Sequence, residues 1–211
     1  PLLGQRKPLL FPRTGPQLWP PAAPCRDSGY AIGKLHYRSS EDDTGFPDQR
    51  IPLHVRDGVV DLFGTIREYG VVKPIMRQEI PKAHPGDSSY IHYDTQITKE
   101  ALAFLEENRE AEKPWCLYVG YTFPHLPLIS PQETWNLYDE ASLPMPFAYH
   151  RGERAEHESF RDIRDFLGLQ EEYTGEEIRR AIHAYYGMCP FLDTQIGQLL
   201  GRLRDLGLDE N

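Results

Sequence analysis

Two residues of the stretch IGKLHY have side chains that can bind an anion and transfer a proton. Lys34 and His36 stand two positions apart, and that spacing on a β-strand puts both side chains on one face. A cation and an imidazole that project together can hold the anionic group of a sulfate or phosphate ester and move a proton during its hydrolysis. A surface lysine and a structural histidine fit the same spacing, because a two-residue pattern is weak evidence.

A third candidate, His125, follows the most strand-like segment of the chain. Residues 115–121, WCLYVGY, are apolar on both faces, which favours a central strand of a sheet covered on two sides. Pro124 and Pro127 flank His125 and restrict its backbone. Ligands of open α/β sheets lie beyond the carboxyl ends of the strands, which favours a site residue here. By pattern alone, a structural or exposed histidine is an equally good interpretation.

The other clusters of reactive residues point to less chemistry. The acidic stretch SSEDDTGFPD lacks the spacing and terminal Glu of a calcium loop and indicates a solvated loop. The sequence contains neither a Gly-rich phosphate loop nor a G-x-S-x-G nucleophile motif. The cysteines are far apart and form no C-x-x-C pair, so we expect buried free thiols at Cys25, Cys116 and Cys189.

The elements that must position these residues alternate between strand and helix. We expect a strand over residues 30–37, a polar loop over 38–57 and a short helix within 58–70. An amphipathic helix is expected over 96–111, with an apolar face of Ile97, Ala101, Leu102 and Leu105. Because this helix precedes the strand at 115–121, the pattern indicates an α/β fold. A further helix after His125 is predicted from Ser130 as N-cap, Pro131 and Glu133.

The C-terminal third is expected to be a polar loop, residues 140–170, followed by one long helix. A short helix is expected in the loop at FRDIRDFLG. Thr174 and Glu177 form the capping box of the long helix, Pro190 should kink or end it, and Gly207 should terminate it. Its predicted apolar face consists of Ile178, Ile182, Tyr185, Leu192, Ile196, Leu199 and Leu203.

Composition narrows the classes of partner. The net charge of −9 and scattered basic residues argue against nucleic-acid binding. The sequence has no apolar run near the length of a membrane span and no signal peptide at its start, so no membrane contact is expected, and a cytoplasmic and an exported location both stay open. Residues 1–24 contain seven prolines and no acid, and we expect an atypical segment there, distinct from residues 25–211.

Three longer segments resemble the sulfatase family. They are SGYAIGKLHYRSSEDDTGF, EKPWCLYVGYTFPHLPLISPQETWNLYD and AYYGMCPFLDTQIGQLLGRLRDLGLDEN, and they occur in the family's order. The resemblance implies that residues 25–211 are an internal part of a sulfatase catalytic domain. It also implies a partial alkaline-phosphatase-like α/β fold, with a mostly parallel sheet flanked by helices.

The resemblance also implies roles for the three candidate residues. In the family, a formylglycine made from cysteine forms a hydrate that attacks sulfur, and a divalent metal, usually calcium, holds the sulfate oxygens. Lys34 would bind the sulfate and the hydrate, and His36 would act as the base that breaks down the sulfated intermediate. His125 would lie against the ester oxygen and help the leaving group depart. The expected substrate is a small-molecule or carbohydrate sulfate ester.

The sequence departs from the family in what it lacks. It contains no C-x-P-S-R motif for the formylglycine and no early paired aspartates for the metal, so no metal ligand is assigned. We therefore expect an incomplete fragment that is inactive by itself, while the complete enzyme hydrolyses a sulfate ester. Two alternatives stay open: a phosphonate or phosphodiester hydrolase of the same superfamily, and a catalytically silent binding module.

Overall fold

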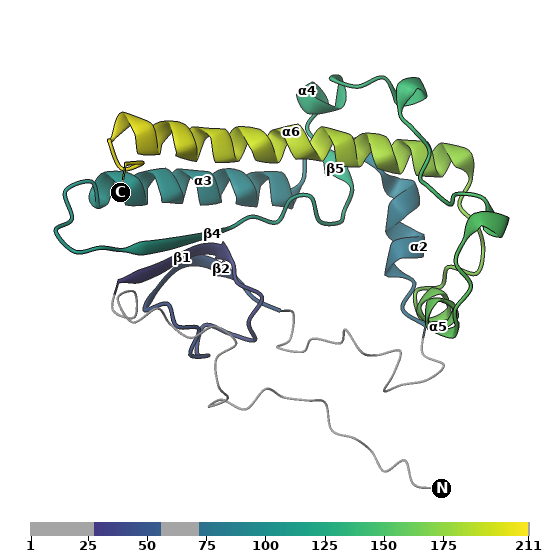
Figure 1. Cartoon of the computed structure of the whole chain (residues 1–211), viewed down its shortest axis with the longest axis horizontal. Coiled ribbons are helices and arrows are strands. Elements are labelled where there is room, and N and C mark those ends of the chain that lie inside the picture. The colour runs from purple at the N-terminus through teal and green to yellow at the C-terminus, as the bar shows by residue number, and fades with distance from the viewer. Residues whose placement is uncertain (1–27, 56–71, 211) are drawn as a thin grey trace, which may run out of the picture. The chain divides into compact units, whose positions relative to one another are not determined.

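The computed structural model describes residues 28–55 and 72–210 (Figure 1), and these residues form parts of two compact units. Unit 1 contains the described residues of Pro1–Val60, His92–Thr122 and Thr194–Asn211, and unit 2 those of Asp61–Ile91 and Phe123–Asp193. The atypical segment predicted at 1–24 and the helix predicted at 58–70 lie outside the described residues. No helix in the described ranges has the length and apolar character needed to cross a membrane.

Unit 1 is built on a parallel sheet of three strands. β1 (Gly29–Lys34) lies between β2 (Asp48–Leu53) and β4 (Cys116–Gly120), and both pairings are parallel. The parallel pairing confirms the predicted α/β fold. The prediction of an unbroken loop over 38–57 is wrong, because β2 lies within it. The strand at 115–121 was predicted to be central in the sheet, but β4 is an edge strand of the described sheet and β1 is the central one.

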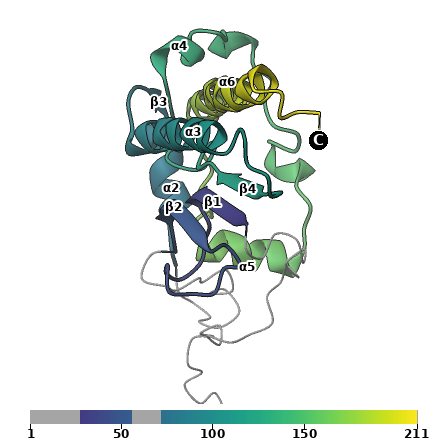
Figure 2. The ribbon, with the colours of Figure 1, turned by 90° about the vertical axis from the view of Figure 1, so that its left-hand side faces the viewer.

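One face of this sheet carries the core of unit 1. The helix α3 (Ser89–Glu107) lies along it, and Figure 2 shows α3 and the C-terminal end of α6 (Gly175–Asp205) on the same side of the strands. Ile97, Ala101 and Leu105 of the predicted apolar face are buried, together with Phe104 and the strand residue Ile32. The helix starts at Ser89, earlier than the predicted residue 96. A buried Leu or Ile side chain contributes about 1.5–3 kcal/mol, so this cluster holds α3 on the sheet.

The other face of β4 is open, which corrects two expectations. Side chains alternate along a strand, so Leu117 and Val119 pack against the α3 core while Cys116 and Tyr118 point to the opposite face. Cys116 is exposed and Tyr118 is 44% exposed, so this strand is covered on one side only among the described residues. Cys116 and Cys189 form no disulfide, but both are exposed and not buried as predicted, while Cys25 lies outside the described residues.

Two glycines allow β1 and β4 to approach at their carboxyl ends. Gly33 and Gly120 are register partners. Gly33 has φ of +94°, and a Cβ there would collide with the backbone oxygen of Gly120 and lie 2.7 Å from Ile97 Cδ1. A Cβ at Gly120 would collide with the backbone oxygen of Lys34. Both positions therefore require glycine, and the strand end that carries Lys34 depends on them.

Unit 2 consists of short elements around the N-terminal part of a long helix. In chain order the elements are α2 (Ile75–Glu79), η3 (Ile80–Lys82), β3 (His84–Pro85), β5 (Ile129–Ser130), α4 (Gln132–Trp135), η4 (Glu140–Ser142), η5 (Arg151–Glu153), α5 (Glu158–Phe166) and α6 (Gly175–Asp205). β3 and β5 pair in parallel. The short helix α5 confirms the helix predicted at FRDIRDFLG.

The long helix α6 begins and ends as predicted. Thr174 N donates to Glu177 Oε2 at 2.7 Å and Glu177 N donates to Thr174 Oγ1 at 3.1 Å, which is the capping box. Gly207 follows the helix with φ of +67°. Pro190 lies inside α6 and does not end it. Apolar side chains pack on both sides of Pro190 along the helix, and this packing offsets the lost hydrogen bond.

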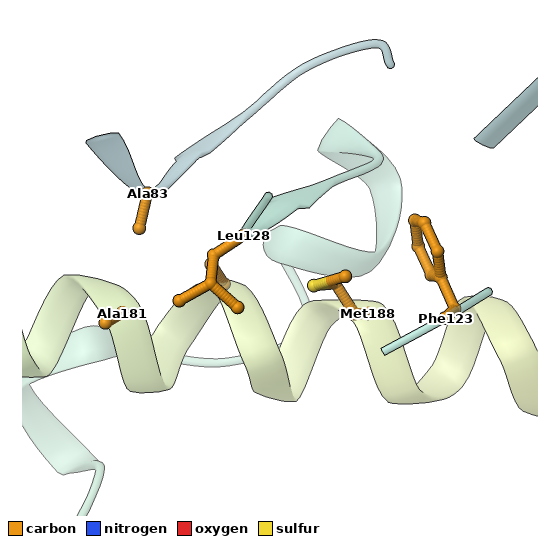
Figure 3. Close-up of a cluster of buried hydrophobic side chains, with 6 residues drawn as sticks. Ala83, Phe123, Leu128, Ala181 and Met188 are labelled. Atoms are coloured by element: carbon orange, nitrogen blue, oxygen red, sulfur yellow. The ribbon is translucent and has the colours of Figure 1, made fainter. Parts of the chain in front are cut away.

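The buried face of α6 in unit 2 differs from the predicted one. It consists of Ala181, Ala184 and Met188, which form a cluster with Ala83, Phe123 and Leu128 (Figure 3). Tyr185 and Ile196, which were predicted on the apolar face, are 46% and 39% exposed. Large apolar residues directed the prediction, whereas small alanines occupy the packed face, because they allow the neighbouring segments to lie close to the helix axis.

The predicted capping box at Ser130 does not form. Ser130 belongs to β5, and Pro131 is the N-cap of α4 without a side-chain cap. Ser130 is fully buried, and its Oγ makes no hydrogen bond within the residues that the structure describes. A Cβ at Gly187 of α6 would lie 2.6 Å from this Oγ, so Ser130 is used for close packing on α6.

Replacing Gly33 tests the close approach of β1 and β4. Gly33→Ala combines a left-handed backbone with a steric collision, so we expect a loss of about 3 kcal/mol in the free energy of unfolding. Gly197→Ala is the control, because nothing lies within 4 Å of a Cβ at this position in α6. Gly197→Ala should raise the free energy of unfolding by about 0.5–1 kcal/mol. Urea unfolding followed by circular dichroism measures both, and equal stability of the two variants would contradict the argument.

Candidate functional site

Lys34 is the last residue of β1 and is half-buried. Some basic side chains of the chain have acidic partners: Arg50 Nη2 lies 2.7 Å from Glu107 Oε2, and Lys82 Nζ lies 2.7 Å from Glu79 Oε1. Lys34 has no ion pair within the described part of the chain. A half-buried ammonium without a carboxylate nearby keeps its charge available for an anion from solution.

His36 stands outside the strand, which corrects the premise that its side chain shares a strand face with Lys34. β1 ends at Lys34, and His36 has φ of +61°. The backbone N–H groups of Leu35 and His36 both donate to Leu53 O, at 3.2 and 3.3 Å. These bonds hold the turn against the end of β2, and the His36 side chain is exposed. The position of His36 therefore follows from the turn, and strand alternation does not determine it.

The acidic side chains of the loop after His36 make hydrogen bonds within the loop. Asp42 accepts from Arg38 Nη2 at 2.6 Å and from Arg38 Nε at 3.1 Å. The side-chain hydrogen bond from Arg38 lowers the pKa of Asp42. Asp43 Oδ1 accepts from Gly45 N at 3.1 Å. These contacts hold the side chains of Asp42 and Asp43 within the loop.

The end of β4 is anchored by a buried carboxylate that the sequence analysis missed. Asp94 of α3 is fully buried, and its Oδ1 accepts from Thr122 N at 2.8 Å and from Thr122 Oγ1 at 2.7 Å. One signal was present: Asp94 lies three and seven positions before Ile97 and Ala101, on the buried face of the helix. A polar residue such as Asp94 within the apolar face of a helix indicates a buried hydrogen-bonding role.

His125 belongs to unit 2 and is exposed. Its Nδ1 lies 2.8 Å from Leu126 O. A carbonyl oxygen only accepts, so Nδ1 carries the proton. The neutral ring then has its lone pair on Nε2, and no hydrogen bond reaches Nε2 from the described residues. The ring also meets Tyr90 edge-on, with centroids 6.4 Å apart. This geometry makes Nε2 the nitrogen that can exchange a proton with a bound molecule.

The three predicted site residues are therefore distributed over both units. Lys34 and His36 lie in unit 1, two positions apart at the end of β1, and His125 lies in unit 2. Within each unit, these residues offer a cationic or imidazole nitrogen without a partner among the described residues. Such nitrogens can bind an oxyanion and move protons.

The residues that the structure describes do not fit the metal and the formylglycine that the resemblance implies. No group of three or more His, Cys, Asp or Glu side chains within them is placed to hold a metal ion. Neither described cysteine, Cys116 or Cys189, stands in a C-x-P-S-R motif.

Comparison with known proteins identifies the family. The Sulfatase family model matches residues 28–211. Choline-sulfatase of Rhizobium meliloti (strain 1021) is 30% identical over 204 residues, which are 84% of this chain and 37% of that protein. Iduronate 2-sulfatase of Mus musculus is 32% identical over 129 residues, which are 56% of this chain and 23% of that protein. The chain thus spans 23% to 37% of the length of these two relatives.

A solved structure also aligns with the chain. The crystal structure of Ps i-CgsB in complex with k-i-k-neocarrahexaose has a TM-score of 0.42 and 16% sequence identity, over 86% of this chain and 34% of that chain. The family match over residues 28–211 settles the relationship. The chain belongs to the sulfatase family, a family of hydrolases, and its parallel strands and flanking helices are part of an alkaline-phosphatase-like α/β fold.

Proposed function

We propose that these 211 residues form part of the active site of a sulfuric ester hydrolase, with Lys34, His36 and His125 acting on one sulfate ester. The observation that carries the proposal is the half-buried Lys34 at the carboxyl end of β1, without an ion pair in the described part of the chain. Membership of the sulfatase family supplies the reaction class. The substrate class is a small-molecule or carbohydrate sulfate ester.

Lys34 binds the sulfate group. Two opposite charges 4 Å apart attract by about 4 kcal/mol at the effective dielectric of a site near the protein surface. A neighbouring carboxylate would compete for this attraction. Arg50 and Lys82 are occupied in this way by Glu107 and Glu79, whereas Lys34 is not. The carboxyl ends of parallel strands are where open α/β sheets bind ligands, which supports the same role.

His125 protonates the oxygen of the leaving alcohol. Its Nδ1–H is held by Leu126 O, so the proton that it transfers is the one on Nε2 of the imidazolium form. General acid catalysis of this kind contributes about 10²–10⁴-fold to a rate, and the contribution grows as the leaving group becomes poorer. His36, exposed beside Lys34, acts as the base in the breakdown of the sulfated intermediate.

The nucleophile and the metal ligands are proposed to come from sequence outside these 211 residues. We expect the isolated chain to release no alcohol from an aryl sulfate in the presence of calcium, because Lys34, His36 and His125 can bind and protonate but supply no attacking group. A colorimetric assay of the purified chain checks this. Calcium-dependent turnover that disappears in His125→Ala would contradict it and would place the nucleophile within the chain.

Substitutions in the complete gene product test the assigned roles. Lys34→Ala should lower kcat/KM for an alkyl sulfate by about 10²–10³-fold, the usual loss for an electrostatic contact with the transition state. His125→Ala should lower kcat by about 10²–10⁴-fold for an alkyl sulfate and much less for 4-nitrophenyl sulfate, which needs no acid to leave. Lys99→Ala, at an exposed lysine of α3, is the matched control and should leave both rates unchanged.

The same assays separate the two rival functions. Faster turnover of phosphonates or phosphate diesters than of sulfate esters would establish the phosphonate or phosphodiester hydrolase. Absence of a C-x-P-S-R motif from the complete gene, together with no turnover of any ester, would establish the silent binding module.

A further inference from the structure

We propose that Asp94 is a positioning residue for His125, acting through its hydrogen bonds to Thr122. The inference rests on the proposed function only in giving His125 its role as a proton donor. The hydrogen-bond geometry that carries it is independent of that function.

Asp94 accepts two hydrogen bonds from one residue, Thr122. One carboxylate oxygen, Oδ1, accepts both the backbone N–H and the hydroxyl of Thr122, at 2.8 and 2.7 Å. Asp94 is fully buried and Thr122 is 3% exposed. Hydrogen bonds to a charged acceptor are about twice as strong as neutral ones. Together the two bonds fix both the position of the Thr122 backbone and its side-chain rotamer.

The residue before Thr122 is held by the next turn of the same helix. The Tyr121 hydroxyl lies 2.9 Å from Thr98 Oγ1, and Thr98 Oγ1 donates to Gln195 Oε1 of α6 at 2.7 Å. Burial, and after it the charge of Asp94, raise the pKa of Tyr121, so its hydroxyl keeps its proton. Two neighbouring residues at the end of β4 are thus tied to α3 by separate contacts.

The chain between Thr122 and His125 has little freedom to absorb a displacement. Only Phe123 and Pro124 intervene. Phe123 is 5% exposed, and its ring lies 4.8 Å from that of Phe191. Pro124 has a fixed φ. A shift of the Thr122 backbone is therefore passed on to His125, whose Nδ1–H must still meet Leu126 O.

The choice of a charged residue at position 94 supports positioning over simple stabilisation. Burying a carboxylate costs several kcal/mol, and well-packed apolar residues often give equal or greater stability. What an apolar residue lacks is a directional acceptor for two donors of one residue. Asp94 supplies that acceptor to Thr122, which lies three positions before His125 in the chain.

The decisive experiment is NMR spectroscopy of the His125 ring in the 211-residue chain. Long-range ¹H–¹⁵N spectra, recorded under alkaline conditions where imidazoles are neutral, show which ring nitrogen carries the proton. In the parent chain we expect the proton on Nδ1. In Asp94→Asn we expect a mixture of the two tautomers and at least tenfold faster hydrogen exchange of the Thr122 amide. Thr122→Ala, which removes one of the two bonds, should move both signals less in the same direction.

Thr98→Val is the matched control. It removes a buried hydroxyl one turn along α3 and leaves the bonds between Asp94 and Thr122 in place. It should lower the melting temperature comparably and keep the proton on Nδ1 of His125. An unchanged His125 tautomer in both Asp94→Asn and Thr122→Ala would overturn the proposal, as would an equal change in Thr98→Val.

Kinetics of the complete gene product add a second test. Asp94→Asn should lower kcat for an alkyl sulfate at least tenfold more than for 4-nitrophenyl sulfate, and it should have no further effect in the His125→Ala background. An equal loss in both backgrounds would show that Asp94 does not act through His125. A parent protein without sulfate-ester turnover would overturn the proposed function alone, because the His125 tautomer still decides the role of Asp94.

Discussion

A side chain at Gly33 would collide with the backbone of Gly120 and with Ile97, so β1 and β4 can lie in register only because both glycine positions lack one. The collision involves backbone atoms, which have no alternative rotamer to adopt. Lys34 follows Gly33 directly, and His125 lies five residues after Gly120. Lys34 and His125 thus follow the carboxyl ends of two paired strands, β1 and β4. The anion-binding chemistry that we propose depends on this contact between two backbones.

Several charged residues are paired within the fold, whereas the candidate residues are not. Arg38, Arg50 and Lys82 have acidic partners, and the buried Asp94 holds Thr122. Lys34, His36 and the Nε2 atom of His125 have no partner among the described residues. In a chain with net charge −9, an unpaired half-buried lysine is a specific arrangement, because carboxylates are abundant. The chain belongs to the sulfatase family, and we propose that this arrangement binds a sulfate ester.

Local signals predicted much of the fold, and tertiary contacts account for what they missed. The cap at Thr174 and Glu177, the strand at 115–121 and the helix that contains Ile97 depend on neighbours within a few residues. β2 was missed because DQRIPL is polar and exists by pairing with β1. Ser130 was assigned to a cap because its motif is local, whereas its pairing with β3 and its packing on Gly187 are not. The candidate residues were indicated by their residue types and their places at predicted strand ends, and the resemblance supplied their roles. The buried Asp94 that anchors Thr122 needed the structure.

The most direct test of the central claim is whether the binding of one sulfate ion changes the NMR signals of all three residues. Sodium sulfate is titrated into the 211-residue chain at constant ionic strength, and the side-chain resonances of Lys34, His36 and His125 are followed by NMR. The account predicts that the three signals shift along one saturating curve, while the exposed Lys99 on α3 does not respond. Separate curves for Lys34 and His125, or an equal response at Lys99, would contradict it.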